Sequence, residues 1–166
     1  MANDANNDSR IRQFWNAYAE ATRASTTFAI LQFGDSKVLA DELAALVIAG
    51  TKRGTTSLRR DFVALGWPEP KPGDFGIVVD GNKTPRCIVR IVQVDVKPMR
   101  DVDETFASDE GGGDGSLSWW MSSHARFFNR QSARDGLPVD NDTEVVLERF
   151  EVVWPPEFSD RRPQRT

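Results

Sequence analysis

The sequence predicts an α+β fold built as a small curved sheet or β-barrel flanked by helices. Three observations lead to this class: apolar residues at helical spacing, β-branched runs joined by hairpins and irregular loops, and no regular alternation of strands and helices. The chain has 166 residues, the size of one ordinary domain, and shows no internal repeat or linker. We therefore expect one domain over 10–156, with a disordered N-terminal tail at 1–9 and a C-terminal tail at 157–166.

Three amphipathic helices are expected. The first covers about 10–23, where large apolar residues recur every three or four positions. The second begins after Asp35 or Ser36, both of which suit an N-cap, and ends at Gly50. The third follows Ser116 as its N-cap. Aromatic side chains on these faces are expected to form core rather than a stacking surface.

The β-structure is expected in the second half of the chain. Phe75–Val79 is an apolar run that ends at the hairpin signal Asp80–Asn82. Arg86–Lys97 is a long β-branched run whose alternation slips near Ile91-Val92, which indicates a bulge or burial on both faces. A last strand covers Val145–Trp154 and ends before two prolines.

Composition excludes several classes of protein. The net charge of −4 excludes a polybasic coat, and 39% hydrophobic residues exclude global disorder. Cys87 is the single cysteine and there is one histidine, so an intramolecular disulfide, a thiolate zinc cluster and a His-based metal centre are excluded. No stretch reaches the ~18 apolar residues of a membrane span, and no signal core is found, so we expect a cytoplasmic protein without a membrane partner.

The segment 101–115 is acidic and rich in glycine, without a basic residue, and we expect a solvated loop. Such a loop would repel phosphate and favour a nucleoside-sized ligand. Gly111–Gly113 lacks the alternating ligand positions of a calcium loop. Phosphate-binding glycine motifs and the G-x-S-x-G motif are absent from the sequence. A carboxylate metal site stays open, but no metal and no cofactor are expected.

The segment from Gly50 to Arg60 contains Lys52, Arg53 and further arginines interleaved with hydroxyl residues, and no acid. Directly after a packed helix, such a segment can present an ammonium group and hydroxyls to one cleft. Alternatively, the basic residues are solvated and the threonines begin a strand, which composition alone favours.

Six segments stand out for their order and spacing over about 28–154: Phe33-Gly34-Asp35, Leu39–Leu43, Gly50-Thr51-Lys52, Lys71–Asp74, Phe106–Asp114 and Val146–Val153. Together they resemble the ASCH-domain family. The resemblance implies a PUA-like fold, a small β-barrel flanked by helices with a cleft beside the Gly-x-Lys segment. The family is linked to RNA. Some small members are amidohydrolases that remove the acetyl group of N4-acetylcytidine, and a ribonuclease activity is ascribed to another member.

The resemblance also implies catalytic residues. The small amidohydrolases use a Lys, a Thr three residues later and a Glu of a later acidic segment, which correspond here to Lys52, Thr55 and Glu110. The Glu has neighbouring alternatives in the same segment: Glu104, Asp109 and Asp114. This sequence departs from the family by having Arg53-Gly54 after the lysine, which affects the expected substrate more than the cleft.

Amide hydrolysis needs a nucleophile, an acceptor for its proton and a donor to the leaving nitrogen. Thr55 would supply a hydroxyl or position water. A desolvated Lys52 would act as a base, and a charged one would stabilise an oxyanion. Glu110 would pass a proton or hold Lys52, so the segment after the second helix and the acidic segment must face each other.

Other polar and aromatic residues are assigned lesser roles. The candidate substrate-binding residues are Arg53, Ser57, Asp35 and Trp67. A helix cap is the stronger interpretation of Asp35, and a packed, hydrogen-bonded imidazole is favoured over a general base for His124.

Three functions are compatible with the sequence, and RNA or a modified nucleoside is the expected partner. The first is hydrolysis of an amide on a modified cytidine such as N4-acetylcytidine. The second is a ribonuclease that cleaves single-stranded RNA through the same cleft. The third is an RNA-binding module without catalysis, whose footprint would be Lys52, Arg53, Arg59 and Arg60.

Overall fold

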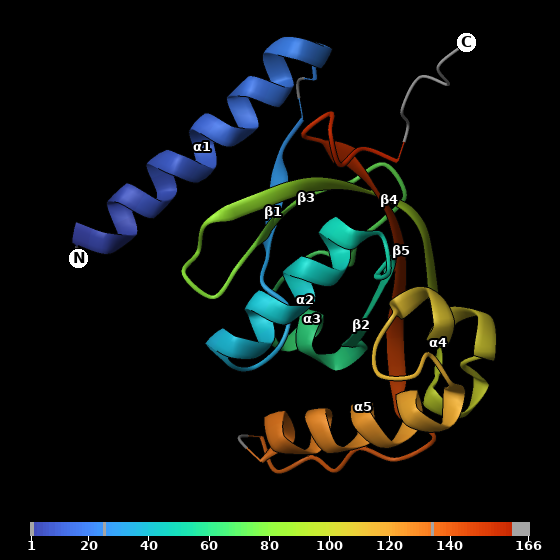
Figure 1. Ribbon diagram of the computed structural model, residues 1–166. Coiled ribbons are helices and arrows are strands. Elements are labelled where there is room, and N and C mark those ends of the chain that lie inside the picture. The colour runs from blue at the N-terminus through green and yellow to red at the C-terminus, as the bar shows by residue number, and fades with distance from the viewer. Residues whose placement is uncertain (1, 25, 134, 161–166) are drawn as a thin grey trace, which may run out of the picture. The chain divides into compact units, whose positions relative to one another are not determined.

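The computed structural model describes residues 2–24, 26–133 and 135–160. The fold is α+β, as predicted, and its elements are shown in Figure 1. In chain order they are α1 (Ala2–Thr22), β1 (Phe28–Leu31), α2 (Lys37–Ala49), β2 (Gly54–Leu58), α3 (Arg59–Leu65), β3 (Phe75–Val79), β4 (Pro85–Pro98), the 3₁₀ helix η1 (Met99–Asp101), α4 (Glu104–Glu110), α5 (Leu117–Ser132) and β5 (Glu144–Trp154).

Five strands form one mixed sheet in the order β1-β3-β4-β5-β2. The strands β1 and β3 pair in parallel, whereas β3 with β4 and β2 with β5 pair antiparallel. The chain divides into two compact units: a first unit of residues 1–50, 72–91 and 150–166, and a second unit of residues 51–71 and 92–149. The long strands β4 and β5 each contribute residues to both units.

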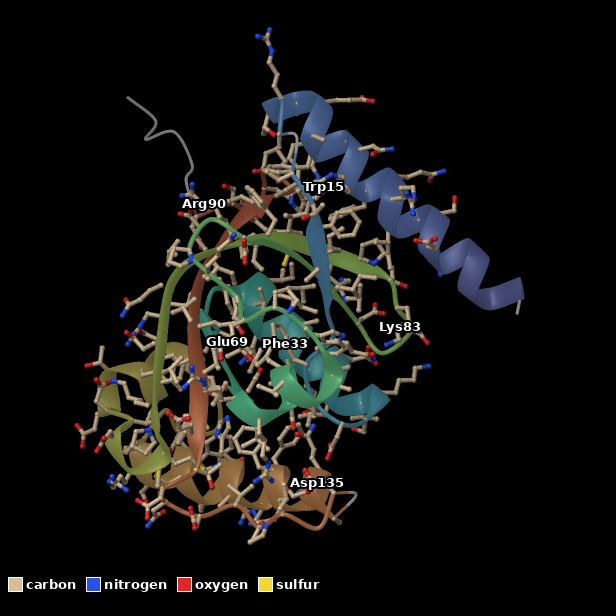
Figure 2. The ribbon with its side chains drawn as sticks, turned by 180° about the vertical axis from the view of Figure 1, so that it is seen from behind. Trp15, Phe33, Glu69, Lys83, Arg90 and Asp135 are labelled. Carbon is tan, nitrogen blue, oxygen red and sulfur yellow. The ribbon has the colours of Figure 1, made fainter. Side chains whose placement is uncertain are left out.

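The core of the first unit is apolar and aromatic. Ile11, Trp15 and Tyr18 of α1 are buried and cluster with Ile77 and Ile88. Trp15, labelled in Figure 2, packs among neighbouring rings, as the predicted core role requires. The helical spacing of the sequence therefore marked a buried face.

Helix α1 is longer than the sequence predicted. It begins at Ala2 instead of near residue 10, so described residues expected in a tail are helical. Asp8 lies 3.7 Å from Arg12 in an i,i+4 ion pair, which supports helix on the exposed face where apolar spacing gives no signal.

Helix α2 has the ends that the sequence predicted. The Ser36 hydroxyl oxygen accepts a hydrogen bond from the Leu39 backbone N–H at 3.1 Å, so Ser36 is the N-cap and Asp35 is not. Gly50 ends the helix with a left-handed backbone, φ +89°.

The acidic segment is not the solvated loop that composition predicted. The Asp103 carboxylate accepts from the Phe106 backbone N–H at 2.8 Å and caps α4. Phe106 and Ala107 are buried in the core of the second unit, and this helix packs against α5 and β2 (Figure 1). Local capping together with two buried apolar residues makes this stretch helical.

Helix α5 and the last strand are confirmed. The Ser116 hydroxyl accepts from the Trp119 backbone N–H at 3.1 Å, and Trp120 and Phe128 are buried, as expected. The predicted strands at 75–79, 86–97 and 145–154 correspond to β3, β4 and β5.

The predicted burial on both faces at Ile91-Val92 is wrong. Ile91 is buried, whereas Val92 is 46% exposed, and the strand passes from the first unit to the second at this step. The register shift of the β3–β4 pair lies elsewhere, between Val78 and Val79. The strands β1 and β2 and the helices α3 and α4 were not predicted as such, apart from the alternative that the threonines begin a strand. No helix in the described ranges is both long enough and apolar enough to cross a bilayer.

Candidate active site

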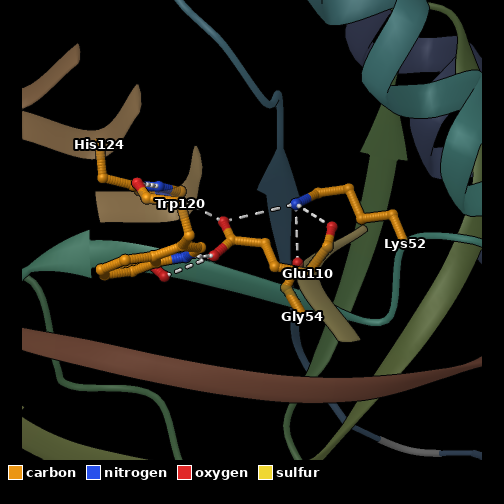
Figure 3. Close-up of polar contacts among 6 residues, drawn as sticks. Lys52, Gly54, Glu110, Trp120 and His124 are labelled. Carbon is orange, nitrogen blue, oxygen red and sulfur yellow. Dashed lines mark hydrogen bonds and ion pairs between the residues drawn. The ribbon is translucent and has the colours of Figure 1, made fainter. Parts of the chain in front are cut away.

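Lys52 is a buried lysine in the segment between α2 and β2. The residue is 3% exposed. Its Nζ donates to the carbonyl oxygen of Gly54 at 2.7 Å and to that of Glu110 at 3.4 Å. The same nitrogen lies 3.7 Å from the carboxylate oxygen Oε1 of Glu110 (Figure 3). The segment after the second helix therefore meets the acidic segment, as the predicted site requires.

Glu110 is the centre of the polar cluster. It is the last residue of α4 and is 6% exposed. Its Oε2 accepts from the Thr56 hydroxyl at 2.9 Å and from the indole Nε1–H of Trp120. Its Oε1 lies 3.1 Å from Nε2 of His124 (Figure 3). Both oxygens are thus held by partners from two other elements, which fixes the plane of the carboxylate.

Burial and charge act on both members of the pair. Burial lowers the pKa of Lys52, and the negative charge of Glu110 opposes this effect without cancelling it. Burial also raises the pKa of Glu110, but the charges of Lys52 and His124 and the hydrogen bonds from His124 and Trp120 outweigh it and lower that pKa to about 2. The carboxylate is ionised at neutral pH, beside an ammonium group that releases its proton more readily than an exposed lysine.

The glycine run explains how α4 comes so close to Lys52. A Cβ on Gly111, whose φ is +76°, would lie 2.3 Å from the carbonyl oxygen of Thr51. A Cβ on Gly113 would lie 2.1 Å from the ring of Trp119. The glycines therefore allow close packing on both sides of the loop.

The approach of the two segments is also fixed through the backbone. The Arg53 N–H donates to the carbonyl oxygen of Asp109 at 2.7 Å. Asp109 in turn accepts from Arg149 Nε at 2.7 Å through its carboxylate, so it is engaged outside the Lys52 cluster. Of the acids considered as alternatives, Glu104 and Asp114 are exposed, and Glu110 is the carboxylate that faces Lys52.

The threonine whose hydroxyl donates to the Glu110 carboxylate is Thr56, not Thr55. Successive side chains of a strand point to opposite faces, so Thr55 and Ser57 of β2 lie on the face away from Thr56. Thr55 is paired in register with Glu148 of β5. The sequence could not distinguish the two threonines, because the pairing of β2 with β5 determines which side chains of β2 face Glu110. A catalytic role of Thr55 stays a prediction.

The predicted substrate-binding residues differ in burial and in the compact unit to which they belong. Arg53 is half-buried and donates through Nη1 to the carbonyl oxygen of Lys52 at 2.8 Å. Trp67 follows α3 and is 62% exposed, and Ser57 is half-buried on β2. Asp35 is exposed and belongs to the first unit, whereas the cluster belongs to the second.

His124 belongs to the polar cluster around Glu110, although the sequence predicted only a packing role for it. Its ring stacks on that of Trp120, with centroids 4.2 Å apart, so the packed imidazole is confirmed. Its contact with Glu110 was not foreseen. The i,i+4 spacing of Trp120 and His124 on α5 is the sequence signal that places both on one face.

A family model described as the ASCH domain matches residues 29–154. This chain belongs to the ASCH-domain family.

Solved structures of ASCH domains resemble this one closely. The crystal structure of an ASCH domain from Lactobacillus crispatus has a TM-score of 0.82 and 31% identity, over 89% of this chain and 96% of that chain. The crystal structure of a protein from Enterococcus faecalis has a TM-score of 0.81 and 31% identity, over 87% of this chain and 88% of that chain. No curated protein matches the chain.

The donor set of this ASCH domain suits proton transfer. Within residues 2–24, 26–133 and 135–160, no group of three or more His, Cys, Asp and Glu side chains is arranged to hold a metal ion. A lysine with a lowered pKa beside an ionised carboxylate can accept a proton and return it. In its charged form, the same lysine can stabilise an oxyanion.

Proposed function

We propose that this ASCH domain hydrolyses the amide of a modified cytidine of the N4-acetylcytidine type. The observation that carries the proposal is the buried Lys52–Glu110 pair, with Nζ 3.7 Å from Oε1. Buried ionisable groups are rare without a partner or a task, and a lysine whose pKa is lowered by burial is suited to accept a proton.

The reaction can be written with this chain's own groups. Neutral Lys52 takes a proton from the attacking water, whose oxygen adds to the acetyl carbonyl carbon. The bond between that carbon and N4 then breaks, and Lys52 returns the proton to N4. The products are cytidine and acetic acid, which releases its own proton to solvent and becomes acetate. Glu110 holds the lysine in place through the cycle, and its carboxylate remains ionised.

We assign different roles to the hydroxyl groups of Thr55 and Thr56. Thr55 is proposed from the family resemblance to act as the nucleophile or to position water. Thr56 is proposed from its hydrogen bond to Glu110 to orient the carboxylate. Comparing Thr55→Val with Thr56→Val separates the roles, because both substitutions remove one hydroxyl from the same strand.

The ion pairs of the basic residues favour a small substrate over a phosphate backbone. Arg59 Nε lies 2.7 Å from Glu69, and its Nη1 lies 3.2 Å from Glu144. Arg60 lies 3.7 Å from Asp135. Arg59 and Arg60 are paired with acids, and Lys52 is buried. These three residues therefore offer little free positive charge to the phosphates of an RNA.

Hydrolysis of N4-acetylcytidine is the direct test. Purified protein is incubated with N4-acetylcytidine, and cytidine and acetate are measured by chromatography. We expect turnover by the wild type and at least a ~100-fold loss in Lys52→Met. Lys37→Met, which removes an exposed lysine at the start of α2, is the matched control and should keep full activity.

A parallel reaction with labelled single-stranded RNA distinguishes the ribonuclease alternative. Cleavage of this RNA that requires Lys52, without release of cytidine from the nucleoside, would contradict the amidohydrolase proposal. Equal cytidine release by the wild type and by correctly folded Lys52→Met would do the same.

A further inference from the structure

His124 of α5 faces two acceptors with its two ring nitrogens. Nε2 lies 3.1 Å from Oε1 of Glu110, and Nδ1 lies 2.9 Å from the carbonyl oxygen of Trp120. The ring is held between the indole of Trp120 and the ring of Phe128, with centroid distances of 4.2 and 5.6 Å. Its side chain is 14% exposed. The imidazole therefore has little freedom to turn away from either acceptor (Figure 3).

The two contacts determine how many protons the ring must carry. A backbone carbonyl oxygen can only accept a hydrogen bond, and so can an ionised carboxylate. A neutral imidazole has one N–H and could satisfy only one of these acceptors, whereas an imidazolium has two. With Glu110 ionised, satisfaction of both contacts requires a proton on Nδ1 and on Nε2.

We propose that His124 is a positioning residue of the active site, that it carries a proton on both ring nitrogens, and that it holds Glu110 at the distance from Lys52 that the reaction uses. This inference rests on the proposed function for its catalytic consequence, whereas the proton count follows from the two contacts together with an ionised Glu110 carboxylate. It assigns a role to α5, which supplies no group to the Lys52, Thr55 and Glu110 set.

The distances show why His124 rather than Lys52 sets the position of the carboxylate. Oε1 is 3.1 Å from His124 Nε2 but 3.7 Å from Lys52 Nζ, beyond ordinary hydrogen-bond distance. Oε2 is held separately by Trp120 and Thr56. Lys52 therefore acts on Oε1 through its charge, whereas His124 supplies the hydrogen-bonded contact that orients this oxygen.

The described partners of the His124 ring are Glu110 from α4 and Trp120 and Phe128 from its own helix. Lys52, from the segment before β2, reaches the same carboxylate oxygen. Arg126 lies on the same helix, is exposed, and provides a matched site at which a positive charge can be removed away from Glu110.

Nitrogen NMR tests the proton count directly, because His124 is the one histidine of the chain. In protein labelled with ¹⁵N-histidine, we expect both ring nitrogens to show protonated shifts at pH 7. Glu110→Gln, which removes the negative charge, should lose this doubly protonated signal at the same pH. A wild-type ring with a single N–H at pH 7 would overturn the proposal.

The positioning role has a readout that does not depend on activity. The indole N–H of Trp120 reports the carboxylate to which it donates. Its proton signal, assigned with Trp120→Phe, should move in His124→Gln and stay in place in Arg126→Gln. An unchanged indole signal in a folded His124→Gln protein would contradict the role, whatever the enzyme hydrolyses.

Kinetics test the catalytic consequence. In His124→Gln we expect kcat for N4-acetylcytidine to fall about 10- to 100-fold, with KM within about twofold of wild type, because a displaced catalytic group slows the chemical step. Arg126→Gln should match the wild type in both constants. Equal kcat in His124→Gln and wild type would overturn the positioning role. Absence of turnover in the wild type would instead overturn the proposed function, and the two NMR experiments would still decide the role of His124.

Discussion

In the first unit, Trp15 and Tyr18 of α1 cover Ile77 and Ile88, and the buried contacts are apolar. In the second unit, an equally buried place holds Lys52 and Glu110. Burial of the apolar group stabilises the fold through the hydrophobic effect. Burial of the charged pair requires each charge to be compensated by partners, which favours a functional role over a stabilising one. The two regions should therefore respond differently to substitution and to pH.

The largest loss of stability is expected from the apolar region. Trp15→Ala removes the ring that packs on Phe28 and Phe75, with centroid distances of 4.9 and 5.6 Å. We expect the free energy of unfolding to fall by about 3–5 kcal/mol. Urea denaturation at pH 5 and pH 8 should give the same loss at both values. A loss that depends strongly on pH would contradict the apolar character of this core.

The charged region should instead show a pH-dependent stability. Glu110 has its pKa lowered to about 2 in the folded state from 4.5. A group with a depressed folded pKa contributes stability above its unfolded pKa and loses it as pH falls through the folded one, so the loss should occur between about pH 5 and pH 2. The expected contribution is about 3 kcal/mol. In Glu110→Gln the fall in stability over this window should be smaller, as measured by urea denaturation at several pH values.

Substitutions in the loop Gly111–Gly115 should have an intermediate effect on stability, and Gly115 provides a matched control for Gly111. Gly111 and Gly115 both have φ +76°, but a Cβ meets the Thr51 carbonyl oxygen at 2.3 Å only at Gly111, and nothing within 4 Å at Gly115. Gly115→Ala should cost about 1 kcal/mol from backbone strain. Gly111→Ala should cost about 1–3 kcal/mol more and reduce activity, because α4 must move away from Lys52. Equal losses in the two variants would show that close packing of the loop on this segment is unimportant.

The smallest effect separates the two threonines. Thr56→Val removes the hydroxyl that donates to Glu110 at 2.9 Å and should lower stability by about 1 kcal/mol. Thr55→Val should change stability less, because valine suits a strand and the Thr55 hydroxyl lies on the other face of β2. Thermal unfolding of both variants measures the difference, and a larger loss in Thr55→Val would contradict the assignment of the two faces.

The elements with strong local signals could be predicted from the sequence. Ser36 and Ser116 cap α2 and α5, and the apolar spacing between each cap and the helix end is regular. Helix α4 escaped prediction because it spans only Glu104–Glu110, and its two buried residues Phe106 and Ala107 are adjacent rather than periodic. Strands as short as β1 likewise offer too few residues for alternation to be visible.

The candidate site was predictable in part. Lys52 and Glu110 followed from the family resemblance, and the structure brings them together. Thr56 could not be distinguished from Thr55, because the facing of β2 depends on its register with β5. The contact between His124 and Glu110 depends on how α4 packs against α5, which local sequence does not specify.

The pH dependence of N4-acetylcytidine hydrolysis tests the central claim, that buried Lys52 acts as the base beside ionised Glu110. Initial rates of cytidine release are measured between pH 6 and 10 for the wild type and for Lys52→Met. We expect the wild-type rate to rise with pH and to level off below the ordinary lysine pKa of about 10.4, and the variant to show no such rise. A wild-type rate that falls across this range, or a rise of the same size in the variant, would contradict the account.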